Sequence, residues 1–168
     1  MTTATATIVQ EPAAVLRATA SPVPAGDFGS EKLAQVLADM KAGLAGEDDG
    51  VAIAAPQIGV SLQIFVVAAK ALGKRQKEDL VFINPEITRL GRKREALSEG
   101  CLSVRWKYGM VKRALTATVR AYNEKGNEFV MKAEGLLAQI FQHETDHLKG
   151  VLFIDKATDI EDLPPQKK

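Results

Sequence analysis

The sequence has one cysteine and two histidines among its 168 residues. A single cysteine cannot form a disulfide within the chain, which indicates a reducing compartment, and we expect a cytoplasmic protein. No stretch reaches the roughly 18 apolar residues that a membrane-spanning helix needs. The first ten residues lack the basic and apolar pattern of a secretory signal and the arginines of a transit peptide. We therefore expect no membrane association and no targeting segment.

The sequence also lacks an excess of charge of either sign. Its 22 basic and 21 acidic residues leave a formal net charge of +1 at pH 7. A protein this close to neutral has no global field that attracts nucleic acid, so we expect no direct nucleic-acid partner. A chain of this length can bury a core of its own. We expect residues 1–168 to form a single domain and the protein to be a monomer.

Hydrophobic periodicity predicts one early helix and several strands. Residues 30–44 repeat apolar side chains at helical spacing, with Ser30 as a candidate N-cap. The segment 50–60 is rich in small residues and contains a proline, which predicts an irregular buried loop. Residues 155–168 are expected to fray. Runs of β-branched, aromatic or alternating residues predict strands over 62–68, 80–83, 86–90, 116–122, 127–133 and 151–154.

Both histidines lie in the segment 134–150, EGLLAQIFQHETDHLKG. His143 and His147 are four residues apart with Glu144 between them, the pattern of an H-E-x-x-H motif. Residues four apart share one face of an α-helix, so the two imidazoles point into the same space. Glu144 lies one position round the helix, within reach of a water on a bound metal. The wide apolar arc of this helix indicates burial, and Gly150 is a candidate left-handed cap at its end.

The alternative interpretation is a pair of hydrogen-bonded core histidines, because so short a pattern arises by chance in many proteins. Against it, a glutamate on the buried side of a helix is costly without a partner. A catalytic metal on two histidines needs a third protein ligand and an open position for water. Phe153 stands where the extended peptidase pattern would have another histidine. Cys101 remains as the soft candidate, although a lone cysteine is more often a small buried hydrophobe.

Three separated segments resemble the three motifs of peptide deformylases. They are 50–57 (GVAIAAPQ), 99–103 (EGCLS) and 142–147 (QHETDH), and shorter phrases extend the similarity over nearly the whole chain. The resemblance implies an α+β fold in which small β-sheets pack around a central C-terminal helix that carries the H-E-x-x-H motif. It also implies a bacterial-type enzyme that removes the formyl group from the N-terminal formylmethionine of nascent polypeptides leaving the ribosome.

The resemblance further implies that Cys101, His143 and His147 bind one divalent metal ion, with water as the fourth ligand. In such proteins this ion is typically Fe²⁺, and Zn²⁺ or Ni²⁺ can occupy the site. A thiolate with two imidazoles favours these ions over Mg²⁺ or Ca²⁺. The metal lowers the pKa of its water to roughly 7, so that hydroxide can attack the formyl carbonyl.

The expected mechanism gives roles to further residues. Glu144 is the expected general base, and afterwards the acid that protonates the leaving amine. The Gln57 side-chain amide and the Leu102 backbone N–H are expected to stabilise charge on the formyl oxygen. An apolar pocket for methionine is assigned to Val51, Leu136 and Ile140. The full set of expected substrate-binding residues is Gly50, Val51, Ala52, Glu99, Gly100, Leu136 and Ile140.

The sequence departs from the family pattern at two places. Ala52 stands where the first motif usually has glycine, and residues 104–106 intervene where a proline usually follows the second motif. Trp106 is interpreted either as partial core or as a wall that faces the peptide. A match at Arg113 leads to the hypothesis that this residue pairs with Glu99 and fixes the cysteine loop. These departures keep open a non-catalytic, deformylase-like binding protein, and the shared helix motif keeps open a metallopeptidase.

Overall fold

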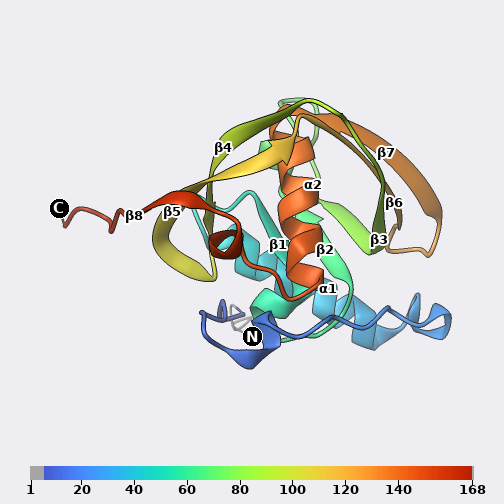
Figure 1. The fold of residues 1–168 in the computed structure, drawn as a ribbon. Helices are drawn as coiled ribbons and strands as arrows, with labels where there is room; N and C mark the ends of the chain where they lie inside the picture. The colour runs from blue at the N-terminus through green and yellow to red at the C-terminus, as the bar shows by residue number, and fades with distance from the viewer. Residues whose placement is uncertain (1–5, 168) are drawn as a thin grey trace.

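The structure is a computed structural model that describes residues 6–167. It contains two antiparallel sheets and two α-helices, and the second helix, α2 (Gly135–Leu148), lies at the centre (Figure 1). The larger sheet has the strand order β1-β2-β3-β6-β7, and the smaller has the order β4-β5-β8. The predicted α+β fold, with small sheets around the late helix, is confirmed.

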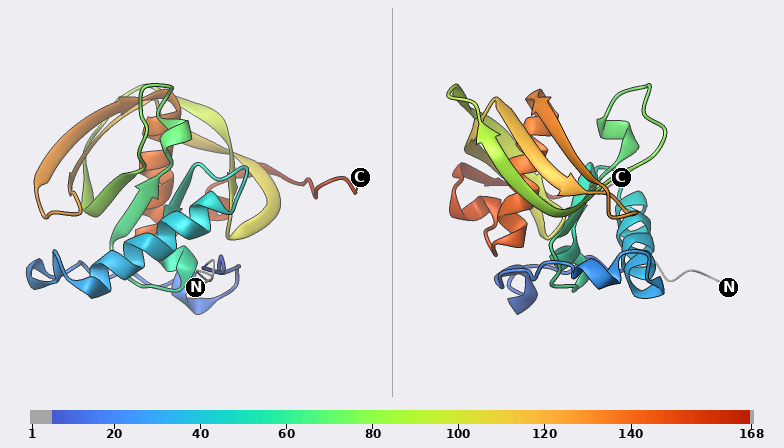
Figure 2. Two further views of the ribbon diagram at one scale, coloured as in Figure 1. Left: turned by 180° about the vertical axis from the view of Figure 1, so that it is seen from behind. Right: turned by 90° about the vertical axis from the view of Figure 1, so that its right-hand side faces the viewer.

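The larger sheet is buried on both faces where β1, β2 and β3 lie. On one face, Phe65 and Val67 of β2 pack towards α2, and on the other, Ile64 and Val66 pack towards α1 (Glu31–Ala45). This two-sided burial explains why β2 is apolar at every position. Figure 2 shows α1 and α2 on opposite sides of these strands. The strands of this sheet are β1 (Ala52–Ala54), β2 (Ile64–Val67), β3 (Leu80–Leu90), β6 (Thr116–Tyr122) and β7 (Glu128–Glu134).

The two helices begin and end for reasons visible in the sequence. Ser30 caps α1, because its hydroxyl accepts a hydrogen bond from the Leu33 N–H at 3.1 Å, as predicted. Gly150 follows α2 with φ +74°, the left-handed conformation expected of it. Among residues 6–167, no helix combines the length and apolar character that crossing a bilayer requires.

Two predictions for the C-terminal part of the chain were wrong, and the first concerns the smaller sheet. Its strands are β4 (Arg94–Cys101), β5 (Val104–Ala114) and β8 (Thr158–Asp162). Since β8 pairs with β5, the expectation that the whole of 155–168 frays was wrong for 158–162. The strand predicted over 151–154 was also wrong, because the chain there forms the short 3-10 helix η5 (Phe153–Asp155). Phe153 is buried beside α2 instead of extending a sheet.

Two segments predicted as irregular are partly regular. The segment 50–60 contributes β1 and the 3-10 helix η3 (Ala55–Ile58). The break expected after position 83 is bridged, because β3 continues through Asn84, which has φ +49°. The Asn84 side chain accepts a hydrogen bond from the Val23 N–H at 2.8 Å and donates one to the Val23 carbonyl at 2.9 Å. These bonds hold a conformation that non-glycine residues rarely adopt.

The segment before α1, residues 6–29, forms an N-terminal arm that lies against the two loops with the first and second motifs. The Val9 N–H donates to the Gln57 carbonyl at 2.7 Å, and the Glu11 N–H donates to the Ser103 carbonyl at 2.8 Å. The arm therefore joins segments that are distant in the sequence. It also contains the 3-10 helices η1 (Ala14–Leu16) and η2 (Ala25–Asp27), and a further one, η4 (Ala69–Ala71), follows β2.

We expect Gly150→Ala to destabilise the protein by about 1–3 kcal/mol, because φ is positive there and an added Cβ would overlap the Arg17 carbonyl. Urea unfolding followed by circular dichroism measures the change. Gly26→Ala is the matched control, since no atom lies within 4 Å of its added Cβ. Equal stability of the two variants would contradict this account of the turn.

Candidate active site

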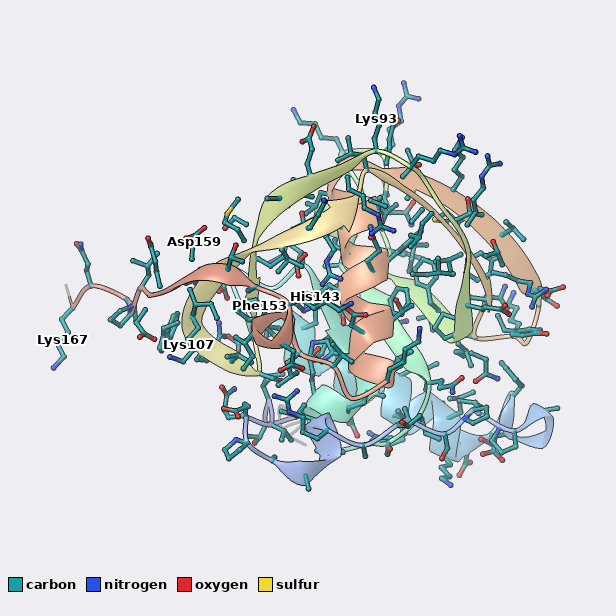
Figure 3. The ribbon with its side chains drawn as sticks, viewed as in Figure 1. Lys93, Lys107, His143, Phe153, Asp159 and Lys167 are labelled. Carbon is teal, nitrogen blue, oxygen red and sulfur yellow. The ribbon has the colours of Figure 1, made fainter. Side chains whose placement is uncertain are left out.

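Helix α2 is fixed against β5 by the side chain of Gln142. Its Oε1 accepts a hydrogen bond from the Ala114 N–H at 2.9 Å, and its Nε2 donates to the Ala114 carbonyl at 2.9 Å. This pair of bonds sets both the height and the rotation of the helix relative to the smaller sheet. The next residue, His143, is thereby held at a defined position beside Phe153, as Figure 3 shows.

The cysteine reaches the helix because β4 ends beside it. Gly100 pairs with Tyr108 on β5, and a Cβ at Gly100 would approach the Tyr108 ring to 2.7 Å. Only glycine therefore allows this close approach of backbone and ring. Cys101 follows and turns its sulfur towards α2, where Sγ lies 3.3 Å from Nε2 of His147.

The structure brings together one donor atom each from Cys101, His143 and His147, all within 4.8 Å of one another. Metal bonds of about 2.0–2.3 Å in a tetrahedral site place ligand atoms roughly 3.5 Å apart, so these residues fit a single ion. Nδ1 of His143 lies 2.9 Å from Oε1 of Glu99, which leaves the other ring nitrogen for the ion. A carboxylate behind a ligating imidazole is a common means of fixing the ring. The three residues could hold a metal ion.

The protonation equilibria of this group are strongly perturbed. Burial alone would raise the pKa of the Cys101 thiol, but the charges and hydrogen bonds of His147 and His143 hold it well below the ordinary value. Burial alone would lower the pKa of His143, whereas its hydrogen bonds to Cys101 and Glu99 and the charge of Glu144 raise it well above the ordinary value. The negative groups that attract a proton to this imidazole also attract a divalent cation.

Glu99 is held by a buried network of ion pairs. Arg113 donates from Nε and Nη2 to the two carboxylate oxygens of Glu99 at 2.7 and 2.8 Å, and from Nη1 to Asp146 at 2.8 Å. Burial alone would raise the pKa of Glu99, but hydrogen bonds from Arg113 and His143 lower it to about 2. The hypothesis that Arg113 pairs with Glu99 is confirmed, and the pair joins the cysteine-bearing hairpin to α2.

Glu144 is 4% exposed, and its Oε2 has no hydrogen-bond partner among the described residues. Burial raises the pKa of this carboxyl group above its ordinary value, against the opposing charges of His143 and His147. A buried carboxylate with a raised pKa and an oxygen that no described residue bonds is suited to accept and release a proton.

Gln57 occupies the opposite wall with both ends of its amide engaged. Its Oε1 accepts a hydrogen bond from the Ala54 N–H at 2.9 Å. Its Nε2 donates to Ser103 Oγ at 3.1 Å and lies 3.6 Å from the sulfur of Cys101. The amide is thus fixed with its N–H groups towards the cysteine loop.

A cleft of about 270 Å³ opens over these groups. All of the expected substrate-binding residues line it, and so do Gln57, Leu102, Cys101, His143 and Glu144. His147 lies behind them at 1% exposure. The cleft also has lining residues outside the expected site set, namely Asp49, Ser98, Arg105, Trp106, Lys107, Tyr108 and Gln139. Of these, only Trp106 had been interpreted as a wall, and its place in the lining favours that interpretation over partial core.

The sequence model of the polypeptide deformylase family matches residues 5–162. The chain belongs to this family. It is therefore a deformylase, an enzyme of a metal-dependent class, and the three motifs on which the resemblance rested lie together around one cleft.

Individual relatives agree with the family assignment. The chain is 43% identical over 153 residues to the peptide deformylase of Desulforudis audaxviator, a match that covers 91% of this chain and 94% of that protein. The class I type b peptide deformylase of Acinetobacter baumannii has been solved with actinonin bound. It superposes with a TM-score of 0.84 at 32% identity, covering 93% of this chain and 100% of the other. The Met-Ala-Ser complex of the same enzyme gives 0.83 at 31% identity, covering 92% and 100%.

We expect Arg113→Met to lower the free energy of unfolding by about 3–5 kcal/mol, because it removes the buried cation between Glu99 and Asp146 and leaves them only His143 and Lys156 as partners. Arg120→Met is the matched control. Its guanidinium pairs with Glu86 and Glu128 on an exposed face, so its loss should cost at most about 1 kcal/mol. Urea unfolding measures both, and similar costs for the two variants would show that burial of the network has no special weight.

Proposed function

We propose that this deformylase removes the formyl group from the N-terminal formylmethionine of newly made polypeptides, with Cys101, His143 and His147 as its metal ligands. The observation that carries the proposal is the meeting of these three donors, at one cleft, with a buried carboxyl oxygen of Glu144 that no described residue bonds. The Acinetobacter baumannii relative solved with Met-Ala-Ser supports a peptide that begins with methionine.

The ion supplies Lewis acidity and an acidified water when it is bound. Fe²⁺ is the proposed ion in the cell, and Zn²⁺ or Ni²⁺ are substitutes of similar ligand preference. The lowered pKa of Cys101 keeps the sulfur in the thiolate form that metals bind. Glu99 holds the His143 ring by its Nδ1, which orients the opposite nitrogen towards the ion.

Glu144 is the proposed general base and acid. Its raised pKa allows the carboxylate to accept a proton from the attacking water and then to donate it to the leaving nitrogen. The carboxyl group is only 4% exposed, so little solvent reaches it.

Gln57 and Leu102 are the proposed donors to the formyl oxygen as negative charge develops on it. The Gln57 amide cannot rotate freely, because Ala54 and Ser103 hold its two ends. A donor fixed before the reaction costs no reorganisation during it. Leu102 lines the same cleft beside the cysteine, and its carbonyl is held by Gln10 Nε2 at 2.7 Å.

The methionine side chain is proposed to lie against Val51, Leu136 and Ile140. These apolar residues line the cleft from two walls, one before β1 and one on α2. Leu136 is 51% exposed and lines the cleft, so its apolar surface is available for a ligand to cover. Gly50, Ala52 and Gly100 line the same cleft and are proposed to contact the peptide backbone. We further propose that residues 1–168 act as one catalytic domain, as a cytoplasmic monomer on chains leaving the ribosome.

We expect Glu144→Gln to reduce formate release from formyl-Met-Ala-Ser by about 10²–10⁴-fold, because the proton acceptor is lost. The metal content should remain unchanged in this variant, because Glu144 is not a proposed ligand. Cys101→Ala is the companion variant and should lose both the metal and the activity. Formate release and metal content are measured under anaerobic conditions, since thiolate-bound Fe²⁺ is readily oxidised.

Several outcomes would contradict the proposal. Loss of metal in Glu144→Gln would make this residue a ligand instead of a base. A metal-loaded protein that binds the peptide without releasing formate would be a binding protein. Cleavage of internal peptide bonds would indicate a metallopeptidase.

A further inference from the structure

Three residues of β5 protrude from its pairing with β4 at the mouth of the cleft. Gly100 pairs with Tyr108, while the next residue, Cys101, pairs with Val104. Residues 105–107 therefore have no partner on β4, although they line the cleft. A bulge of this kind redirects side chains away from the sheet.

The backbone of the bulge is strained and is held from the outside. Trp106 has φ +66°, a conformation that costs a non-glycine residue of order 1–3 kcal/mol and persists only where neighbours impose it. Its carbonyl accepts a hydrogen bond from the Leu163 N–H at 2.7 Å, and Lys107 Nζ pairs with Asp162 at 2.8 Å. The C-terminal segment around β8 thus holds the indole at the cleft.

Arg105, the neighbour of Trp106 on the bulge, contacts the indole and also binds the opposite wall of the mouth. Its guanidinium carbon lies 4.9 Å from the centre of the Trp106 ring. The same guanidinium pairs with Glu47 and with Asp49, at 3.1 Å to the latter, in the segment that leads from α1 to β1. The contact crosses from one wall of the cleft to the other.

These ion pairs decide what chemistry the mouth offers to a peptide. Arg105 is neutralised by Glu47 and Asp49, and Lys107 by Asp162. The two cations and three carboxylates together leave one excess negative charge, and neither cation is left without a partner to select acidic side chains. The indole of Trp106 is 38% exposed, so its aromatic surface remains available.

The proposed position of the substrate brings a side chain to this surface. Under the proposed function, the formyl group lies beside the buried Glu144 and the methionine against Leu136 and Ile140, which line the cleft. An extended residue advances about 3.3–3.6 Å, so the residues that follow methionine pass through the mouth.

We propose that Trp106 is a specificity-determining residue that stacks with an aromatic side chain at one of the two positions after the formylmethionine. The proposal rests on the proposed function. Aromatic pairs contribute enough to favour such substrates by about 2–10-fold in kcat/KM.

The kinetic test compares formyl-Met-Phe-Ser and formyl-Met-Ala-Phe with formyl-Met-Ala-Ser on the metal-loaded enzyme. We expect the better of the two aromatic peptides to exceed formyl-Met-Ala-Ser by about 2–10-fold in kcat/KM. This ratio should fall to about 1 in Trp106→Ala and return in Trp106→Phe. A ratio near 1 in the unmodified enzyme, or one that Trp106→Ala leaves unchanged while all rates fall together, overturns the proposal.

A binding readout separates this proposal from the proposed function. Trp106 is the only tryptophan of the chain, so its fluorescence reports on the mouth alone. We expect Met-Phe-Ser or Met-Ala-Phe to change the emission of the metal-loaded protein at lower concentration than Met-Ala-Ser. Binding seen by calorimetry without any change in emission overturns the proposal, even where Trp106→Ala does not fold. If no substrate releases formate but the peptides still change the emission, the proposed function is contradicted and the stacking on Trp106 is not.

Discussion

The ion pair between Arg113 and Glu99 is the interaction on which the site depends. Both side chains are at most 4% exposed, and the pair joins β4 to β5 through two hydrogen bonds. Glu99 also contacts His143, and Arg113 also contacts Asp146, so α2 is held at two points. One guanidinium therefore sets the position of the hairpin that carries Cys101 against the helix that carries both imidazoles.

This arrangement has an energetic cost that the rest of the fold offsets. Replacing a buried ion pair by apolar residues is often neutral or stabilising, so stability alone does not explain Glu99 and Arg113. Their geometry explains them better, because a carboxylate with a pKa of about 2 remains an anion behind His143. Burial of the apolar cores on both faces of β2 supplies the stability that offsets the cost of this network.

The sequence predicted those parts of the site that depend on local spacing or on a family motif. The common face of His143 and His147 follows from helical geometry, and the pairing of Arg113 with Glu99 followed from a motif match. Tyr108 and Gln139 were missed as lining residues, because their places depend on the register of β4 with β5 and on the packing of α2 against the hairpin. The strand β8 was missed for a related reason. Its residues are all exposed, so no hydrophobic pattern marks a strand whose pairing comes only from the edge of β5.

The interior of the cleft and its mouth offer different chemistry to a ligand. In the interior, burial raises the pKa of Glu144, and no described residue bonds one of its oxygens. A hydrogen bond from a bound water or substrate to this oxygen would therefore be stabilising. At the mouth, Arg105 and Lys107 already have their partners, and the indole of Trp106, 38% exposed, offers aromatic surface to a peptide. The mouth can distinguish later residues of a peptide by aromatic contact with this indole, which is weaker than the interactions available at Glu144.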